Sequence, residues 1–123
     1  MSDARKSKVY QKAYAFAIRV VKLYQHLCKR KKEYVLSKQI LECGTSIGAN
    51  TAEANGAISK KYFSTKISIA YKEALETKYW LSLLKDATYL SVKQFESLFA
   101  DADEIAKMLF SIIKTSRIKT VDR

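Results

Sequence analysis

Apolar residues recur at spacings of three and four along most of the chain, which is the period of an amphipathic helix. On this basis we predict four helices, over about residues 7–29, 37–57, 60–87 and 92–115. Because the connections between them are short, neighbouring helices should run antiparallel. The sequence therefore predicts an all-α fold, an up-down-up-down antiparallel four-helix bundle, as one domain over residues 1–123.

The first predicted helix has a wider apolar face than one neighbouring helix covers. Two adjacent rows of apolar residues build this face. One row comprises Tyr10, Tyr14, Ala17, Val21, Tyr24 and Cys28, and the other Ala13, Phe16, Val20, Leu23 and Leu27. The three tyrosines could stack on bases, but a place in the core or in an interface is favoured.

Local signals place the helix ends. Ser37 and Ser59 are suited to cap the second and third helices, and Ser91 with Gln94 forms a capping box for the fourth. Gly56 fits the end of the second helix as a left-handed residue.

The second helix is rich in small residues, among them Gly44 and Gly48. Glycine costs about 1 kcal/mol relative to alanine in a helix interior, so these positions suggest close approach of a neighbouring helix. Asn50 could fix the packing register through a buried hydrogen bond.

Composition narrows the class of protein. Of 123 residues 48% are hydrophobic and 28% charged, which is typical of a globular domain. With 3 Gly and 0 Pro the chain has few turn-formers, which disfavours a fold of many short strands. The charged first residues do not resemble a signal peptide, and no apolar run is long enough for a membrane span. We therefore expect a cytoplasmic protein with no membrane contact, in which Cys28 and Cys43 are reduced thiols.

The chain is strongly basic, with 23 Lys and Arg against 12 Asp and Glu and a formal net charge of +11. Such a surplus attracts polyanions. In an up-down bundle both termini and the second connection share one end, which gathers cations there. The predicted contacts with nucleic-acid phosphates are Arg5, Lys6, Lys8, Lys60, Lys61, Lys114, Arg117 and Lys119.

The opposite end should be only moderately positive. It collects the four cations of residues 29–32, but Glu33, Asp86 and Glu96 should temper them. Lysines that merely keep a small helical protein soluble are the alternative explanation for the whole basic surplus.

Catalytic and metal sites are not expected. His26 is the only histidine, so the Glu-x-x-His pairs of a carboxylate-bridged metal bundle are absent from the sequence. Glu53, Glu73 and Glu76 could be imagined as a carboxylate site, but ion pairs with neighbouring lysines are favoured. Neither cysteine has a clear base at hand. The sequence predicts a protein that is not an enzyme and holds no cofactor or metal.

The segment LSKQILECGTSIGANTAEA resembles the signature of bacterial four-helix bundle proteins first named for intervening sequences in 23S ribosomal RNA genes. The matching positions are Leu36, Ser37, Gln39, Ile40, Ser46, Ile47, Asn50 and Glu53. Further similarity lies in the segment AFAIRVVKLY and at Phe63, Ile69, Ala70, Glu73, Glu76, Trp80 and Leu81. Where the family often has two arginines this chain has Leu41 and Glu42, which removes a candidate phosphate contact.

The resemblance implies a left-handed bundle that assembles with itself as a ring, typically a homopentamer. A fold relative, the accessory protein of diversity-generating retroelements, is a basic pentameric barrel that binds nucleic acid and a reverse transcriptase. Residues and resemblance together predict a non-enzymatic homo-oligomer that engages RNA or DNA. A scaffold that presents its surface to a protein partner is the alternative.

Overall fold

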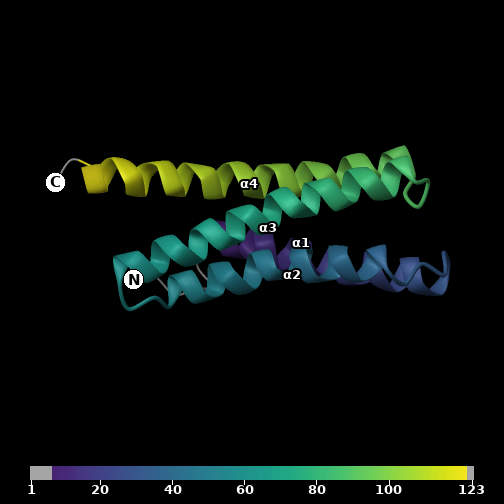
Figure 1. The fold of residues 1–123 in the computed structure, drawn as a ribbon, viewed down its shortest axis with the longest axis horizontal. Coiled ribbons are helices and arrows are strands. Elements are labelled where there is room, and N and C mark those ends of the chain that lie inside the picture. Colours follow the sequence, from purple (N-terminus) through teal and green to yellow (C-terminus); the bar gives the residue numbers. More distant parts are fainter. Residues whose placement is uncertain (1–6, 122–123) are drawn as a thin grey trace.

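The computed structural model describes residues 7–121, with side chains as far as residue 116. Its four helices are α1 (Lys8–Lys29), α2 (Leu36–Asn55), α3 (Lys60–Asp86) and α4 (Val92–Val121), and the described residues contain no strand. Successive helices run in opposite directions (Figure 1). The predicted all-α, up-down-up-down bundle is confirmed.

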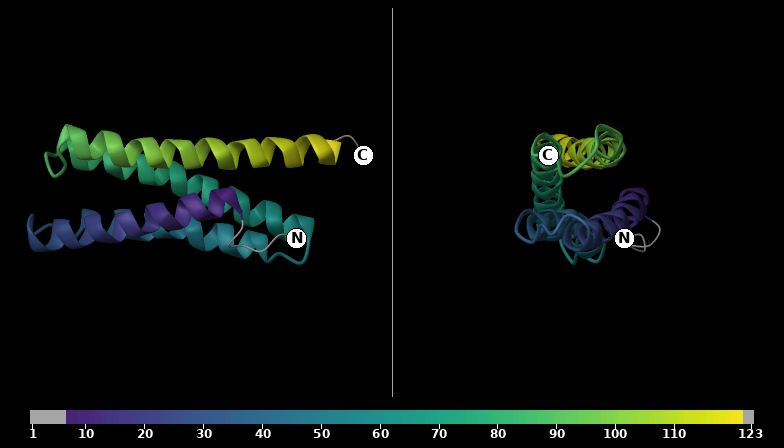
Figure 2. Two further views of the ribbon diagram at one scale, coloured as in Figure 1. Left: turned by 180° about the vertical axis from the view of Figure 1, so that it is seen from behind. Right: turned by 90° about the vertical axis from the view of Figure 1, so that its right-hand side faces the viewer.

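The bundle is held together by contacts between helices that follow one another in the chain and by a smaller contact between α1 and α4. α2 packs on α1 and α3, and α4 packs on α3 and less extensively on α1. In the end view α1 and α4 stand at the two tips of an open C, because α3 crosses obliquely from α2 towards α4 (Figure 2). Ion pairs Lys12–Glu104, at 2.6 Å, and Arg19–Asp101, at 2.5 Å, join the two tips.

One of the two apolar rows of α1 supplies the core. Ala13, Phe16, Val20, Leu23 and Leu27 are buried, and they pack with apolar residues of the other three helices. The second row is half-buried or exposed, so a place in this chain's own core is wrong for it.

Glycine permits the close approach of α1 and α2. A Cβ atom at Gly44 would lie 2.8 Å from both γ-methyl carbons of Val20, closer than packed carbon atoms come. Gly48 is less crowded, since a Cβ there would be 3.6 Å from the Ala13 carbonyl. The predicted role of the small residues is thus confirmed most clearly at Gly44.

Two of the predicted helix starts are confirmed. The amide of Tyr62 donates to Ser59 Oγ at 3.1 Å. In the capping box the Gln94 amide donates to Ser91 Oγ at 3.1 Å, and the Ser91 amide donates to Gln94 Oε1 at 3.0 Å.

Three details of the helix ends differ from the sequence-based expectation. Ser37 does not cap α2, because it lies buried inside the helix and the carboxylate of Glu33 accepts the first amides instead. Gly56 has φ −94°, so it is not left-handed; Lys32 and Thr88 are the left-handed residues among those described. α4 continues to Val121 and does not end near residue 115.

Candidate nucleic-acid interface

The bundle topology brings the α2–α3 connection, the start of α1 and the end of α4 to the same half of the molecule (Figure 1). We call the described cations of this end, Lys8, Lys60, Lys61 and Lys114, the α2–α3 pole. All four side chains are exposed. Arg5 and Lys6 lie outside the described residues, as do the side chains of Arg117 and Lys119.

The lysines of the α2–α3 pole form no ion pair with any side chain that the structure describes. Lys114 Nζ instead lies 5.8 Å from the centroid of the Phe110 ring. The carboxylate of Glu53, on the last turns of α2, pairs with Lys66 at 2.8 Å. The hydrogen bond and charge of Lys66 lower the pKa of Glu53, so this pair is neutral overall at pH 7.

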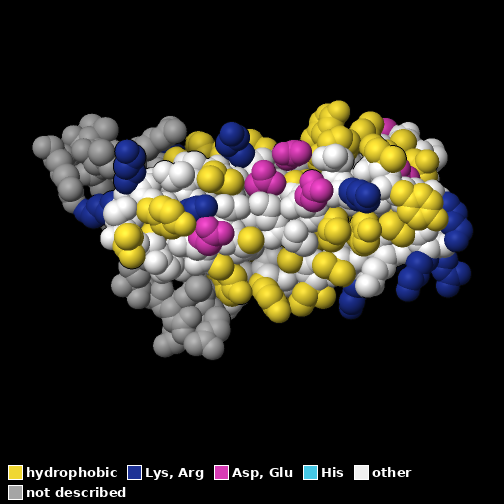
Figure 3. Space-filling model, turned by 60° about the horizontal axis from the view of Figure 1, so that its bottom comes forward, with side chains coloured by type: hydrophobic (Ala, Val, Ile, Leu, Met, Phe, Trp, Pro, Cys, Tyr) yellow, Lys and Arg dark blue, Asp and Glu magenta, His cyan; other side chains and the backbone are white. Residues whose placement is uncertain are grey.

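Three acidic residues of α4, Asp101, Asp103 and Glu104, form ion pairs near the middle of the bundle. Besides the two pairs with α1, Asp103 bridges Lys78 at 2.8 Å and Lys107 at 2.9 Å. Hydrogen bonds from these two lysines lower the pKa of Asp103. In Figure 3 most acidic side chains of the visible face lie over its middle, with Lys and Arg towards the ends. The positive charge left unpaired therefore belongs mainly to the two ends.

At the end opposite the α2–α3 pole, Glu33 and Asp86 have partners other than the cations of residues 29–32, whereas Glu96 is exposed. All four cations of residues 29–32 are exposed, whereas the Glu33 carboxylate is turned to the backbone of α2. Asp86 lies 3.5 Å from its own neighbour Lys85. Sequence reasoning chose Ser37 as the cap and so missed this; the signal was an acidic residue three positions before the helix start.

An exposed apolar stripe runs along α1. Tyr14, Ile18 and Val21 are 57%, 46% and 38% exposed, and the Tyr10 and Tyr14 rings lie 6.0 Å apart. These residues belong to or adjoin the row that the core does not use. We call Tyr14, Ile18 and Val21 the α1 stripe; it is suited to an interface with another chain.

The carboxylates of Glu73 and Glu76 lie close enough to Cys43 to influence the pKa of its thiol. The described residues hold no group of three or more His, Cys, Asp or Glu side chains placed to bind a metal ion. Burial and the nearby charge of Glu76 raise the pKa of Glu73, while Lys78, one of the lysines close to both in sequence, pairs with Asp103. Burial raises the pKa of Cys43 to about 11, so its thiol stays protonated at neutral pH.

The side chain of Asn50 forms its hydrogen bonds within α2. Its side-chain amide donates to the carbonyl and the hydroxyl of Ser46, at 2.9 Å each, within the same helix.

In the described part of the chain no helix is long and apolar enough to span a membrane.

Comparisons with known proteins find a matching family model and a similar crystal structure. A family model described as 23S rRNA-intervening sequence protein matches residues 5–111. The chain is 52% identical to a protein of unknown function from the S23 ribosomal protein family of Bacteroides thetaiotaomicron, whose crystal structure superposes with a TM-score of 0.85. That match covers 86% of this chain and 95% of the other. No curated protein matches the chain.

Proposed function

We propose that this chain, which belongs to the 23S rRNA-intervening sequence protein family, is a non-enzymatic homo-oligomeric bundle that binds RNA or DNA phosphates through its α2–α3 pole. The observation that carries the proposal is the group of four exposed lysines there, without an ion-pair partner among the described side chains. Each such cation can displace a condensed counterion from a phosphate backbone, which favours binding at low salt.

Contact with phosphates also fits the kind of cation present. Lysine is a compact point charge that neutralises a phosphate without the planar fork with which arginine reads a guanine edge. Binding through this pole should therefore depend on salt and be insensitive to base sequence.

Self-assembly is the second part of the proposal. The α1 stripe leaves three large apolar side chains exposed on one helix, and a second copy of the chain would cover them. Light scattering on a sizing column tests this part. A mass several times 14.0 kDa is expected, and a monomer at every concentration would contradict it.

A binding titration tests the nucleic-acid part. Fluorescence anisotropy of a labelled duplex and a labelled single strand should report binding that weakens steeply as salt rises. Replacing Lys60 and Lys61 by glutamine should weaken binding to both probes. The matched control replaces Lys22 and Lys72, two exposed lysines in the middle of α1 and α3, and removes the same charge elsewhere.

If the pole variant and the control weaken binding equally, only the net charge matters and the pole is not a site. If the unaltered protein binds neither probe at low salt, the nucleic-acid proposal falls. The α1 stripe would then favour the alternative function, a scaffold for a protein partner.

A further inference from the structure

The connection between α1 and α2 carries the longest run of consecutive cations in the sequence, Lys29, Arg30, Lys31 and Lys32. All four are exposed, and none forms an ion pair with a described side chain. They lie at the end of the bundle opposite the α2–α3 pole, where Figure 3 shows a group of dark blue side chains at the right.

The carboxylate that directly follows this run in the sequence, that of Glu33, is engaged with the backbone. Glu33 accepts hydrogen bonds from the amides of Val35, Leu36 and Ser37 at 3.1, 3.0 and 2.7 Å. Its charge therefore faces the positive end of the α2 dipole. Desolvation alone would raise the pKa of Glu33, but these amides hold it below the ordinary value. Glu33 thus remains ionised and directed at α2, which leaves the four cations free to meet an external anion.

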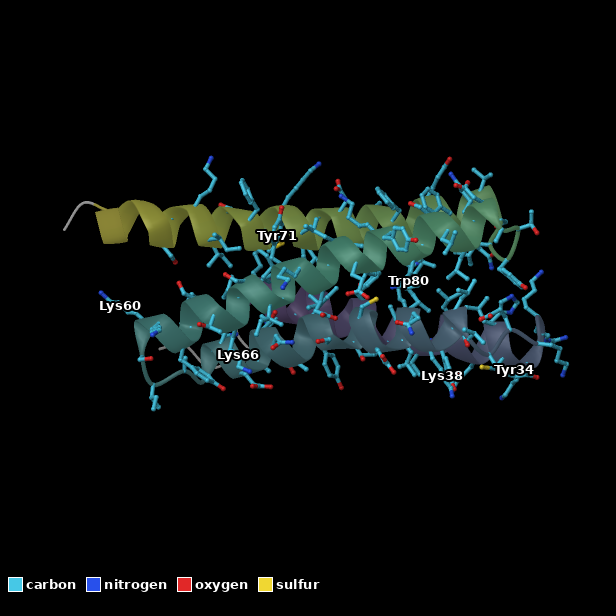
Figure 4. All side chains as sticks on the ribbon, in the orientation of Figure 1. Tyr34, Lys38, Lys60, Lys66, Tyr71 and Trp80 are labelled. Atoms are coloured by element: carbon cyan, nitrogen blue, oxygen red, sulfur yellow. The ribbon has the colours of Figure 1, made fainter. Side chains whose placement is uncertain are left out.

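An aromatic ring stands next to these cations. Tyr34 is 53% exposed, and its ring contacts no other aromatic ring of the described residues. Lys38, also exposed, lies on the first turn of α2, and Figure 4 shows Lys38 and Tyr34 along the same lower edge of the molecule, with Tyr34 nearer its right-hand end. An open aromatic face between cations combines the two elements that bind single strands, base stacking and phosphate neutralisation.

We infer that the loop cluster, defined as Lys29, Arg30, Lys31, Lys32, Tyr34 and Lys38, is a second nucleic-acid site that binds single-stranded RNA or DNA by stacking an unpaired base on Tyr34. The inference rests on the proposed function and adds a preference that the α2–α3 pole does not have. Bases inside a duplex are already stacked, so the Tyr34 ring selects unpaired segments.

The two sites act on different stretches of nucleic acid. Figure 4 places Lys60 and Tyr34 at opposite ends of the bundle. The intervening helix α2 has 20 residues, which corresponds to roughly 30 Å. One molecule therefore has room to hold a duplex segment at one end and an unpaired segment at the other.

The test compares two probes with the same phosphates in an anisotropy titration, a short oligouridine and an abasic strand of equal length. Tyr34→Ala should weaken oligouridine binding roughly fivefold to a hundredfold and leave abasic binding unchanged. Tyr34→Phe, which keeps the ring, should bind oligouridine like the unaltered protein. Tyr79→Ala is the matched control, because Tyr79 on α3 is 60% exposed and lies outside the loop cluster.

The outcomes separate this inference from the proposed function. If Tyr34→Ala weakens both probes equally, or neither, stacking on Tyr34 is overturned. If Tyr34→Ala and Tyr79→Ala weaken oligouridine binding to the same extent, the loop cluster is not the site. Should the Lys60 and Lys61 variant lose affinity in such a case, the proposed function stands alone. If the unaltered protein binds neither strand at low salt, both proposals fail. Far-UV circular dichroism checks that the exposed-site variants remain helical.

Discussion

Adding a methyl group at Gly44 should push apart α1 and α2, which pack closely against each other at this position. The new Cβ of Gly44→Ala would lie 2.8 Å from both γ-methyl carbons of Val20, and Val20 is fully buried with a stiff, β-branched side chain. The clash must therefore move either side chain or backbone, and such overpacking costs about 1–3 kcal/mol. The gain in helix propensity from glycine to alanine offsets about 1 kcal/mol of it.

Gly48→Ala is the matched control in the same helix. It gains the same propensity, but its Cβ would sit 3.6 Å from the nearest atom, which is ordinary contact. The propensity gain therefore cancels between the two variants. The free energy of unfolding of Gly44→Ala should be lower than that of Gly48→Ala by about 1–3 kcal/mol.

Urea unfolding followed by far-UV circular dichroism measures this difference. All variants are compared at one protein concentration, because self-association adds to apparent stability. Adding Val20→Ala to Gly44→Ala should restore part of the loss, since it removes both methyl carbons that clash. Equal stability of the two glycine variants would refute the close packing of α1 on α2.

Further predictions concern single side chains. Glu33→Ala should destabilise the protein by about 1 kcal/mol, because α2 loses its capping carboxylate. The pKa of Glu33 is lowered in the folded state, so its contribution to the free energy of unfolding is present above the ordinary carboxyl pKa and is lost as the pH falls through the folded-state value. In an acid unfolding series, the stability of the Glu33→Gln variant should lack this pH-dependent contribution. Cys28, which is half-buried, should react with a thiol reagent in the native protein at pH 7, whereas Cys43, with a pKa of about 11, should react only on unfolding, as mass spectrometry can show. Ile18→Asp should reduce the mass seen by light scattering without loss of helicity, and an unchanged mass would exclude the α1 stripe as an interface.

The number, order and direction of the helices followed from periodicity, because four long amphipathic segments with short connections have few ways to pack. Local capping was predictable where the donor and acceptor are close in sequence, as at Ser91 and Gln94. It failed at Ser37, since the residue is buried against the rest of the bundle and Glu33 competes for the same amides.

The charge pattern was predictable only in part. Topology placed Lys60, Lys61 and Lys114 at one end, but which carboxylates oppose the cations depends on how side chains are oriented. The sequence puts Glu33 directly after four cations, whereas the structure turns it towards α2. Periodicity also assigned Tyr14 and Val21 to an apolar face without showing that the chain itself leaves that face open.

The salt dependence of binding tests most directly whether unpaired cations at the ends of the bundle hold nucleic acid. The probe is a duplex, because the loop cluster would compete for a single strand. For each duplex phosphate contact, the slope of log K against log salt changes by about 0.9. Replacing Lys60 and Lys61 by glutamine should therefore reduce the magnitude of the slope by about 1.8, while the Lys22 and Lys72 control leaves it unchanged. An equal slope for the pole variant and the unaltered protein would contradict the account.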